Sequence, residues 1–354
     1  MYTLQEFKTV FDPILKEFLD KRINEFLRNT TDPFVRDFVL YSKTLSLAGG
    51  KRIRPYIAYI MYTASGGKNT EAALRLFVCF EIFHMFALMH DDVMDKQDKR
   101  HGIATVHAYV LERLKENDRT GDLENVAKAQ GILAGSLFFS WAMELFLDDK
   151  EFPGKNLKIA HDYFYKMVDE VCLGQIFDID TTSRKVTPEE LVTQKTILKT
   201  SRYTFVRPAQ IGAHLADPNN KLDDYLENLG TKLGIAFQLQ DDLLDIIGDT
   251  KKLEKNILRD VADRQSTFFT NFVLHKGSKM QREKFLHYFG NELNSGEQEE
   301  VINIFTESGA IDAGKKLILQ NLEEAKRLIN MADLGNDYKK TCLDLIQIMQ
   351  DRQN

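Results

Sequence analysis

The chain has 354 residues, of which 43% are hydrophobic and 28% are charged, and its formal net charge is −6. This composition is typical of a globular protein with a large core, and the negative charge argues against nucleic acid as the main partner. Acidic residues interrupt the apolar N-terminus, so we expect neither a signal nor a transit peptide there.

Three cysteines without metal-pair spacing indicate reduced thiols and a cytoplasmic protein. No uncharged apolar stretch reaches the roughly 18 residues that span a bilayer, so we expect no integral membrane protein.

Apolar residues recur with helical spacing along the chain, and no run alternates as a strand would. No linker or internal repeat divides the sequence. We therefore expect an all-α fold, a single domain over residues 1–354 whose helices form a bundle around a central cavity. The expected helices are 3–29, 34–47, 55–64, 70–95, 104–116, 123–149, 155–180, 188–198, 200–216, 221–248, 262–275, 279–292, 296–308, 310–332 and 335–351.

The first chemical signal is "GGKRIRP", residues 49 to 55. Pro55 suits the first position of a helix, which leaves Lys51, Arg52 and Arg54 on a glycine-hinged loop at the helix N-terminus. Such a loop suits an anion such as a diphosphate, although a solvated basic loop has the same pattern.

Two long apolar helices end in the same DDxxD pattern. The aspartates are Asp91, Asp92 and Asp95 in the first motif, and Asp241, Asp242 and Asp245 in the second. The first and last aspartate of each motif lie one turn apart on one helix face. Because carboxylates crowded together need a cation between them, and oxygen-only ligands favour hard ions, the pair predicts Mg²⁺. A solvated helix end is the alternative for either copy alone.

Cationic and polar residues near the two motifs add to this pattern. They are His84, Arg100, His101, Lys199, Thr200, Gln238 and Lys255. Together with the acidic motifs they predict a substrate, such as a diphosphate, whose negative charges are shared by metal ions and cations. No P-loop, nucleophile elbow or HExxH motif is present.

From "GGKRIRP" to "RDVADRQST", residues 49 to 267, the motifs resemble in order those of the trans-isoprenyl diphosphate synthases, or polyprenyl synthetases. The resemblance implies an isoprenoid-synthase helical bundle, usually a homodimer. It also implies the joining of isopentenyl diphosphate to an allylic diphosphate (dimethylallyl, geranyl or farnesyl).

The resemblance also implies a role for each matching residue. Asp91 and Asp95 resemble the ligands of two Mg²⁺ ions and Asp241 that of a third, with Asp92, Asp242 and Asp245 as supporting hydrogen-bond acceptors. The residues that resemble the family's isopentenyl diphosphate site are Lys51, Arg54 and His84, with His101 as a second cation. The residues that resemble the family's cationic clamp on the allylic diphosphate are Arg100, Lys199 and Lys255. Thr200, Gln238 and Gln175 resemble residues that lie beside this clamp. Asp260 matches the acid after the lysine loop.

Two departures from the family pattern concern substrate affinity. His101 follows Arg100 where a second arginine is expected, which makes that cation dependent on pH. The loop "RQST", residues 264 to 267, has Gln265 where a lysine is expected, and Arg264 is a candidate substitute.

The helix before Asp91 is expected to set the product length. Ala87 lies one turn, roughly 6 Å, before Asp91, and the bulky Phe86 and Phe83 follow further down as a floor. In the resembling family this pattern goes with C20 synthases, so geranylgeranyl diphosphate is the first choice, farnesyl diphosphate the second and a longer product the third. If these residues do not set the length, the floor lies on another helix such as "GSLFFSWAMELF", 135–146.

Three other functions are weighed against this one. A terpene cyclase would carry a different second motif, and an HD-type phosphohydrolase using His90 and Asp91 would leave "GGKRIRP" and the second DDxxD unexplained. A non-catalytic subunit of a heteromeric prenyl synthase typically lacks one acidic motif, whereas this chain has both.

Overall fold

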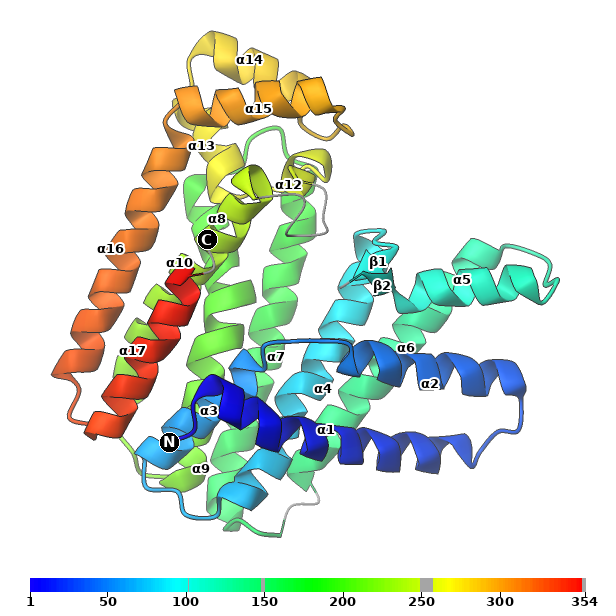
Figure 1. Cartoon of the computed structure of the whole chain (residues 1–354), viewed down its shortest axis with the longest axis vertical. Coiled ribbons are helices and arrows are strands. Elements are labelled where there is room, and N and C mark those ends of the chain that lie inside the picture. The colour runs from blue at the N-terminus through cyan, green and yellow to red at the C-terminus, as the bar shows by residue number, and fades with distance from the viewer. Residues whose placement is uncertain (101, 148–149, 249–256, 352–354) are drawn as a thin grey trace. The chain divides into compact units, whose positions relative to one another are not determined.

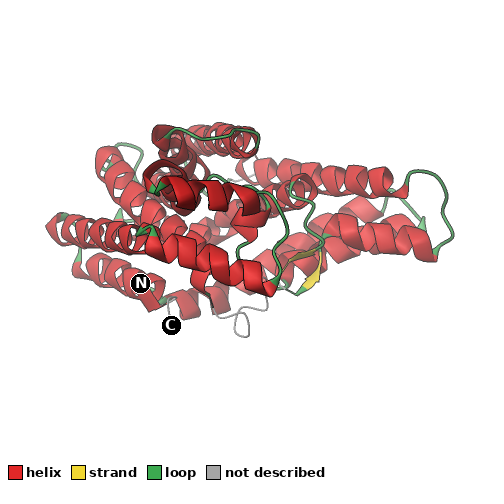
Figure 2. Cartoon of the chain, turned by 90° about the horizontal axis from the view of Figure 1, so that it is seen from above, coloured by secondary structure: helices red, strands yellow, loops and turns green. Residues whose placement is uncertain are grey.

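The computed structural model describes residues 1–100, 102–147, 150–248 and 257–351. Apart from loops, this part of the chain is helical except for two short antiparallel strands, β1 (Lys99–Arg100) and β2 (Ile103–Ala104), which confirms the all-α class (Figure 2). Two compact units divide the chain: an N-terminal unit, residues 2–158, and a C-terminal unit, residues 159–354 with Met1. The single domain over 1–354 stays a prediction.

Helix α4 is the centre of the N-terminal unit. Its phenylalanines Phe77, Phe80 and Phe83 are fully buried, because α4 packs against α1, α3, α5 and α6 (Figure 1). The side chain of Asn69 caps its start by accepting a hydrogen bond from the backbone N–H of Ala72. The helices of this unit are α1 (Leu4–Leu27), α2 (Pro33–Leu47), α3 (Ile53–Ala64), α4 (Thr70–Met94), α5 (Val106–Glu116) and α6 (Leu123–Leu147).

Two of these helices, α4 and α6, are long and apolar enough to cross a membrane by length and composition alone. The expectation that the chain is not an integral membrane protein stays a prediction. The apolar window of α4 is 72% buried inside the protein, as is common for a core helix, and that of α6 is 39% buried.

Helix α10 is the centre of the C-terminal unit, where it packs against η1 and α16. Its DDxxD motif lies in its last two turns. The elements are α7 (Gly154–Thr182), which begins in the N-terminal unit, α8 (Glu189–Thr196), η1 (Ile197–Val206), α9 (Arg207–Ala216), α10 (Asp223–Ile247), α12 (Arg259–Ala262), α13 (Phe268–Lys276), α14 (Lys279–Tyr288), α15 (Ser295–Glu307), α16 (Ala310–Met331) and α17 (Asn336–Asp351).

Helix η1 is a π-helix, where the sequence predicted ordinary α-helix over 200–216. Glycines of its neighbours let it pack closely: a Cβ atom on Gly174 of α7 would lie 2.8 Å from the backbone nitrogen of Lys199, and one on Gly234 of α10 would lie 2.3 Å from Cα of Ser201. Lys199 and Thr200 therefore lie on a wide helical segment held between α7 and α10.

Two other expected helices are corrected. The expected helix 104–116 begins only at Val106, after the β1–β2 hairpin, and the expected helix 262–275 is divided into α12 and α13 by the loop 263–267.

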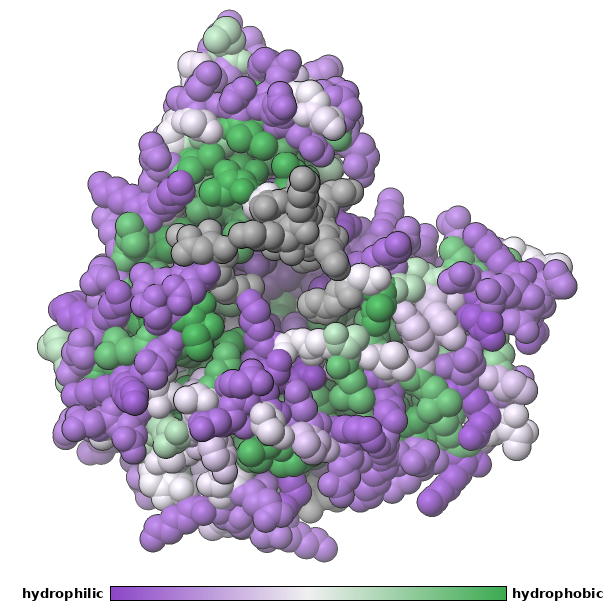
Figure 3. Space-filling view, in the orientation of Figure 1, coloured by the Kyte–Doolittle hydropathy of each residue, from purple (hydrophilic) through white to green (hydrophobic). Residues whose placement is uncertain are grey.

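Helices α14 and α15 show how the hydrophobic pattern decides which face is buried. Phe285 and Phe305 are fully buried, with ring centroids 5.5 Å apart, while Lys284 and Glu300 form an ion pair on the outer side. Hydrophilic side chains accordingly cover this end of the C-terminal unit in Figure 3.

Candidate functional site

The loop before α3 separates its three cations into different roles. Arg52 is only 6% exposed, with Nε 2.8 Å from Asp12 Oδ1 and Nη1 2.7 Å from Glu81 Oε2. Its φ of 55° is left-handed, and a Cβ on the preceding Gly50 (φ +109°) would lie 2.7 Å from the Arg52 guanidinium. Arg52 therefore anchors the loop, so the anion-binding group predicted from the sequence is reduced to two cations.

Those two cations, Lys51 and Arg54, lie on the loop and in the first turn of α3. Lys51 is exposed and Arg54 is half-buried. His84 is half-buried on α4, against which α3 packs, and lies two turns before Asp91 on the same face of that helix. All four residues belong to the N-terminal unit.

The first acidic motif forms the C-terminal end of α4. Asp91 and Asp95 are both half-buried, and the backbone N–H of Asp95 donates to the Asp91 carbonyl oxygen at 2.8 Å. A helix C-terminus carries a partial negative charge, which makes additional carboxylates there unfavourable. A cation bound here would therefore relieve the repulsion at this end of α4.

Asp92, the middle aspartate, is buried and accepts two hydrogen bonds from Arg100. The Nε and Nη2 atoms of Arg100 lie 2.9 and 2.7 Å from Asp92 Oδ1. The β1–β2 hairpin positions Arg100, and the backbone N–H of Gln97 bonds to the Asp92 carbonyl oxygen at 2.8 Å. His101 lies outside the described residues.

In the second motif, hydrogen bonds connect Asp242 to η1. The Thr200 hydroxyl donates to Gln238 Oε1 at 2.6 Å, and Gln238 Nε2 donates to Asp242 Oδ1 at 2.7 Å. Burial raises the pKa of Asp242 to about 7, and the like charges of Asp241 and Asp245 act in the same direction against the Gln238 hydrogen bond. A cation at this position would therefore displace a proton.

Asp245 binds the start of α12. Its two carboxylate oxygens accept hydrogen bonds from the backbone N–H groups of Arg259 and Asp260 at 3.1 and 3.0 Å. Burial raises the pKa of Asp260 well above its usual range, and the neighbouring Asp245 and Asp242 add to this shift. Lys255, which the sequence also placed here, lies outside the described residues.

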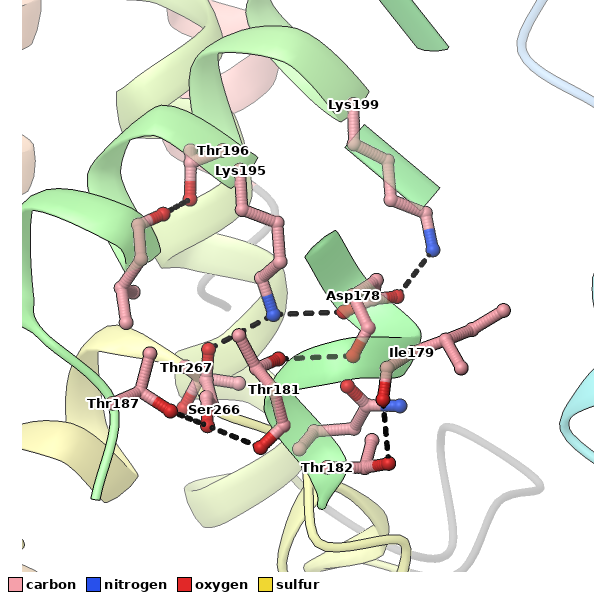
Figure 4. Close-up of polar contacts among 12 residues, drawn as sticks. Asp178, Ile179, Thr181, Thr182, Thr187, Lys195, Thr196, Lys199, Ser266 and Thr267 are labelled. Carbon is pink, nitrogen blue, oxygen red and sulfur yellow. Dashed lines mark hydrogen bonds and ion pairs between the residues drawn. The ribbon is translucent and has the colours of Figure 1, made fainter. Parts of the chain in front are cut away.

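Lys199 of η1 points to an aspartate that the sequence analysis missed (Figure 4). Its Nζ lies 2.5 Å from Oδ2 of Asp178 on α7, three residues after the half-buried Gln175. A second lysine, Lys195, contacts the other oxygen, Oδ1, at 2.8 Å. Burial opposes ionisation of Asp178, but the two ammonium groups hold its pKa below the usual range. The "GQIFD" stretch was the available signal for Asp178.

The residues expected to set product length form an aromatic cluster inside the N-terminal unit. Phe83 is fully buried, Phe86 is half-buried, and their ring centroids are 5.2 Å apart. Phe139 of α6 completes the cluster, 5.2 Å from Phe86 and 6.1 Å from Phe83. Ala87, also half-buried, follows Phe86 toward Asp91. Phe139 belongs to the stretch 135–146, so both helices contribute to this cluster.

His90 has a packing role. Its Nε2 lies 2.9 Å from the Ile132 carbonyl oxygen, its ring lies against Phe86, and a Cβ on Gly135 would lie 2.4 Å from the ring. These contacts argue against a phosphohydrolase in which His90 and Asp91 bind a metal.

Within residues 1–100, 102–147, 150–248 and 257–351, no three His, Cys, Asp or Glu side chains form a ready-made metal cage. The donor groups nevertheless fit Mg²⁺, which binds through one or two carboxylates and completes its shell with water and substrate phosphates. Asp91 and Asp95 supply such oxygens in one unit, and the exposed Asp241 supplies them in the other.

Comparisons with known proteins agree with these features. A family model described as polyprenyl synthetase matches residues 39–307. A geranylgeranyl diphosphate synthase of Methanosarcina mazei is 31% identical over 88% of each chain. A short chain isoprenyl diphosphate synthase of Methanocaldococcus jannaschii is 32% identical over 81% of this chain and 82% of its own.

Among solved structures, the geranylgeranyl pyrophosphate synthase of Corynebacterium glutamicum, complexed with isoprenyl diphosphate and magnesium, is 29% identical. It has a TM-score of 0.92 over 99% of this chain and 100% of its own.

Proposed function

Because this chain belongs to the polyprenyl synthetase family of prenyltransferases and is a short-chain isoprenyl diphosphate synthase, we propose that geranylgeranyl diphosphate (C20) is its main product. The aromatic cluster of Phe83, Phe86 and Phe139 carries this proposal. The small side chain of Ala87 lets the growing tail pass the first turn below Asp91, and the cluster stops it further down. A C15 or a longer product is the alternative.

Two groups of residues bind the two substrates. Lys51, Arg54 and His84 of the N-terminal unit hold isopentenyl diphosphate, with His101 as a further cation. Arg100, Lys199 and Lys255 hold the allylic diphosphate, with Thr200, Gln238, Gln175 and Asp260 positioning the cations and the metal ligands. The Thr200–Gln238–Asp242 hydrogen bonds support this assignment, since they join η1 to the second acidic motif.

Asp91, Asp95 and Asp241 are the ligands that would hold three Mg²⁺ ions, while Asp92, Asp242 and Asp245 keep the motifs in place through the contacts described above. Bound Mg²⁺ would supply positive charge to the departing diphosphate. A relative's structure that contains magnesium and isoprenyl diphosphate supports this proposal.

The chain's own residues guide the reaction by charge and exclusion of water. Lys199 and Arg100 stabilise negative charge on the leaving diphosphate as the allylic carbon–oxygen bond breaks. The double bond of isopentenyl diphosphate then forms the new carbon–carbon bond, and a proton passes to the departed diphosphate. The apolar side chains of α4 exclude water from the allylic cation. No covalent nucleophile takes part.

We also propose a homodimer in the cytoplasm. Val126 and Leu133, seven residues apart on α6, are 39% and 66% exposed, which gives that helix an apolar outer face suited to a second copy. All three cysteines are free, as in proteins of a reducing compartment.

Light scattering tests the dimer. The measured mass should be twice the chain mass, and Leu133→Glu should reduce the measured mass to that of one chain. A monomeric wild type would contradict the dimer.

The test of the proposed function is turnover by the purified chain. Radiolabelled isopentenyl diphosphate, farnesyl diphosphate and Mg²⁺ should yield a C20 product, with geranyl and dimethylallyl diphosphate as further primers. A C15 or C25 main product would overturn the chain length. No turnover by the chain alone, but turnover with a second subunit, would favour the non-catalytic subunit.

A further inference from the structure

The C-terminal unit buries a second lysine beside Lys199. Lys195 of α8 is 8% exposed and lies one turn before Lys199. Its Nζ donates to Asp178 Oδ1 at 2.8 Å and to the backbone carbonyl oxygen of Ser266 at 2.9 Å (Figure 4). A buried ammonium group is costly unless it is paired, so these two contacts account for its position.

The two lysines divide one carboxylate between them. Lys195 takes Oδ1 of Asp178 and Lys199 takes Oδ2. The Lys195 side chain is 10% exposed and that of Lys199 is 28% exposed, so only Lys199 has appreciable access to a ligand. Because each lysine holds a different oxygen, Asp178 does not pair with Lys199 alone.

Lys195 also ties this cluster to the loop 264–267. The Ser266 hydroxyl lies 2.8 Å from that of Thr187, which fixes the loop further. Arg264, considered from the sequence as a substitute for a lysine at position 265, instead bonds to the Phe289 carbonyl oxygen at 3.2 Å and lies over the Phe289 ring. The cation that contacts both this loop and Asp178 is Lys195 of α8.

We propose that Lys195 is a positioning residue, which pairs with Asp178 so that this carboxylate holds Lys199 less tightly and leaves its ammonium group available to the diphosphate of the allylic substrate. This inference rests on the role given to Lys199 in the proposed function. It adds that the charge available at Lys199 depends on a lysine that does not itself contact the substrate.

Calorimetric titration of the full chain with inorganic diphosphate and Mg²⁺ tests the proposal. Lys195→Met should raise the dissociation constant roughly 10-fold, since Asp178 would then pair with Lys199 alone and compete with the diphosphate for that ammonium group. Lys195→Arg should restore most of the affinity. Lys232→Met, which breaks the Lys232–Glu324 ion pair on α10 and α16, is the matched control and should leave the affinity unchanged.

Kinetics separate positioning from mere support of the fold. The KM for the allylic diphosphate should rise in Lys195→Met about as much as the dissociation constant, while the KM for isopentenyl diphosphate stays near its wild-type value. A purely structural role would reduce the folded fraction and kcat and leave both KM values unchanged, which would overturn the proposal.

The Asp178→Asn background gives the decisive comparison. Without the carboxylate, the two lysines no longer share a partner, so adding Lys195→Met should now change the dissociation constant less than about 2-fold. An equal loss in both backgrounds would overturn the proposal. Lys199→Met should also weaken binding; if it does and Lys195→Met does not, only the inference fails. Unchanged binding in Lys199→Met would overturn the assigned role of Lys199 and the inference with it.

Discussion

Arg100 donates both of its hydrogen bonds to a single carboxylate oxygen of Asp92, from Nε at 2.9 Å and from Nη2 at 2.7 Å. Asp92 is 1% exposed, and a buried carboxylate is stabilised by such a charged partner. The β1–β2 hairpin is thereby fastened to the end of α4, where Asp91 and Asp95 lie. The middle aspartate of the motif has a structural role, and the outer two are the candidate metal ligands.

Removal of Arg100 should therefore destabilise the N-terminal unit. Arg100→Met removes the guanidinium that pairs with the buried Asp92, a change that costs about 3 kcal/mol in comparable buried pairs. Urea unfolding should show this loss, and the double variant Arg100→Met with Asp92→Asn should recover part of it. An Arg100→Met protein as stable as the wild type would contradict the role of this pair.

Two neighbouring cations should respond in opposite ways to the same substitution. Arg52→Met removes a guanidinium that pairs with Asp12 and the buried Glu81, so it should lower the unfolding temperature. Lys51→Met should leave stability almost unchanged, because Lys51 is exposed, and raise the KM for isopentenyl diphosphate. Thermal unfolding and steady-state kinetics of both variants check the contrast; a reversed pattern would exchange the two roles.

Without Mg²⁺, the chain should lose stability as the pH rises from about 4 to about 7. The pKa of Asp242 is raised to about 7, so the folded state holds a proton there that the unfolded state has already released. Its stabilising effect is complete below pH 4 and is lost through pH 7, by up to about 1.4 kcal/mol per pH unit. Asp245 and Asp260 are shifted in the same direction.

Urea unfolding in chelator at pH 5, 6, 7 and 8 measures this slope. Asp242→Asn should reduce it, whereas Asp224→Asn, at an exposed position in the first turn of the same helix, should not. Mg²⁺ should stabilise the wild type more at pH 8 than at pH 5. A slope unchanged in Asp242→Asn would show that this carboxyl group does not titrate as described.

Consecutive phenylalanines on α6 should have different effects on product length. Phe139 contacts Phe86, so Phe139→Ala and Phe86→Ala should both lengthen the product, and Ala87→Phe should shorten it. Phe138 packs instead against Trp141, so Phe138→Ala should cost about 3 kcal/mol of stability without changing product length. Product chromatography decides; an unchanged product in all three length variants would place the floor elsewhere.

Much of this fold could be predicted from the sequence because apolar residues recur every three to four positions along its long helices. The strands of the β1–β2 hairpin have two residues each, too few to show alternation. The π-helix depends on close packing against Gly174 and Gly234, which belong to other helices, and so has no local pattern.

The candidate site divides in the same way. The DDxxD motifs can be recognised within five consecutive residues. The family resemblance selected Lys199, Thr200 and Gln238 because they stand in short motifs. Lys195 was missed because a lysine inside a helix is usually solvent-exposed. Its burial depends on Asp178 and Ser266, 17 and 71 residues away, which no local pattern records. Arg52 was likewise grouped with Lys51 because its partners, Asp12 and Glu81, are distant in sequence.

Turnover by variants of the two acidic motifs tests the central claim, that both motifs serve Mg²⁺-dependent prenyl transfer. Chelation of Mg²⁺ should abolish product formation from isopentenyl and farnesyl diphosphates. Asp91→Ala and Asp241→Ala should each lower kcat by at least roughly 100-fold, as expected when transition-state charge stabilisation is removed. Asp224→Ala should retain wild-type turnover. Near-wild-type kcat in Asp91→Ala or Asp241→Ala would contradict the account.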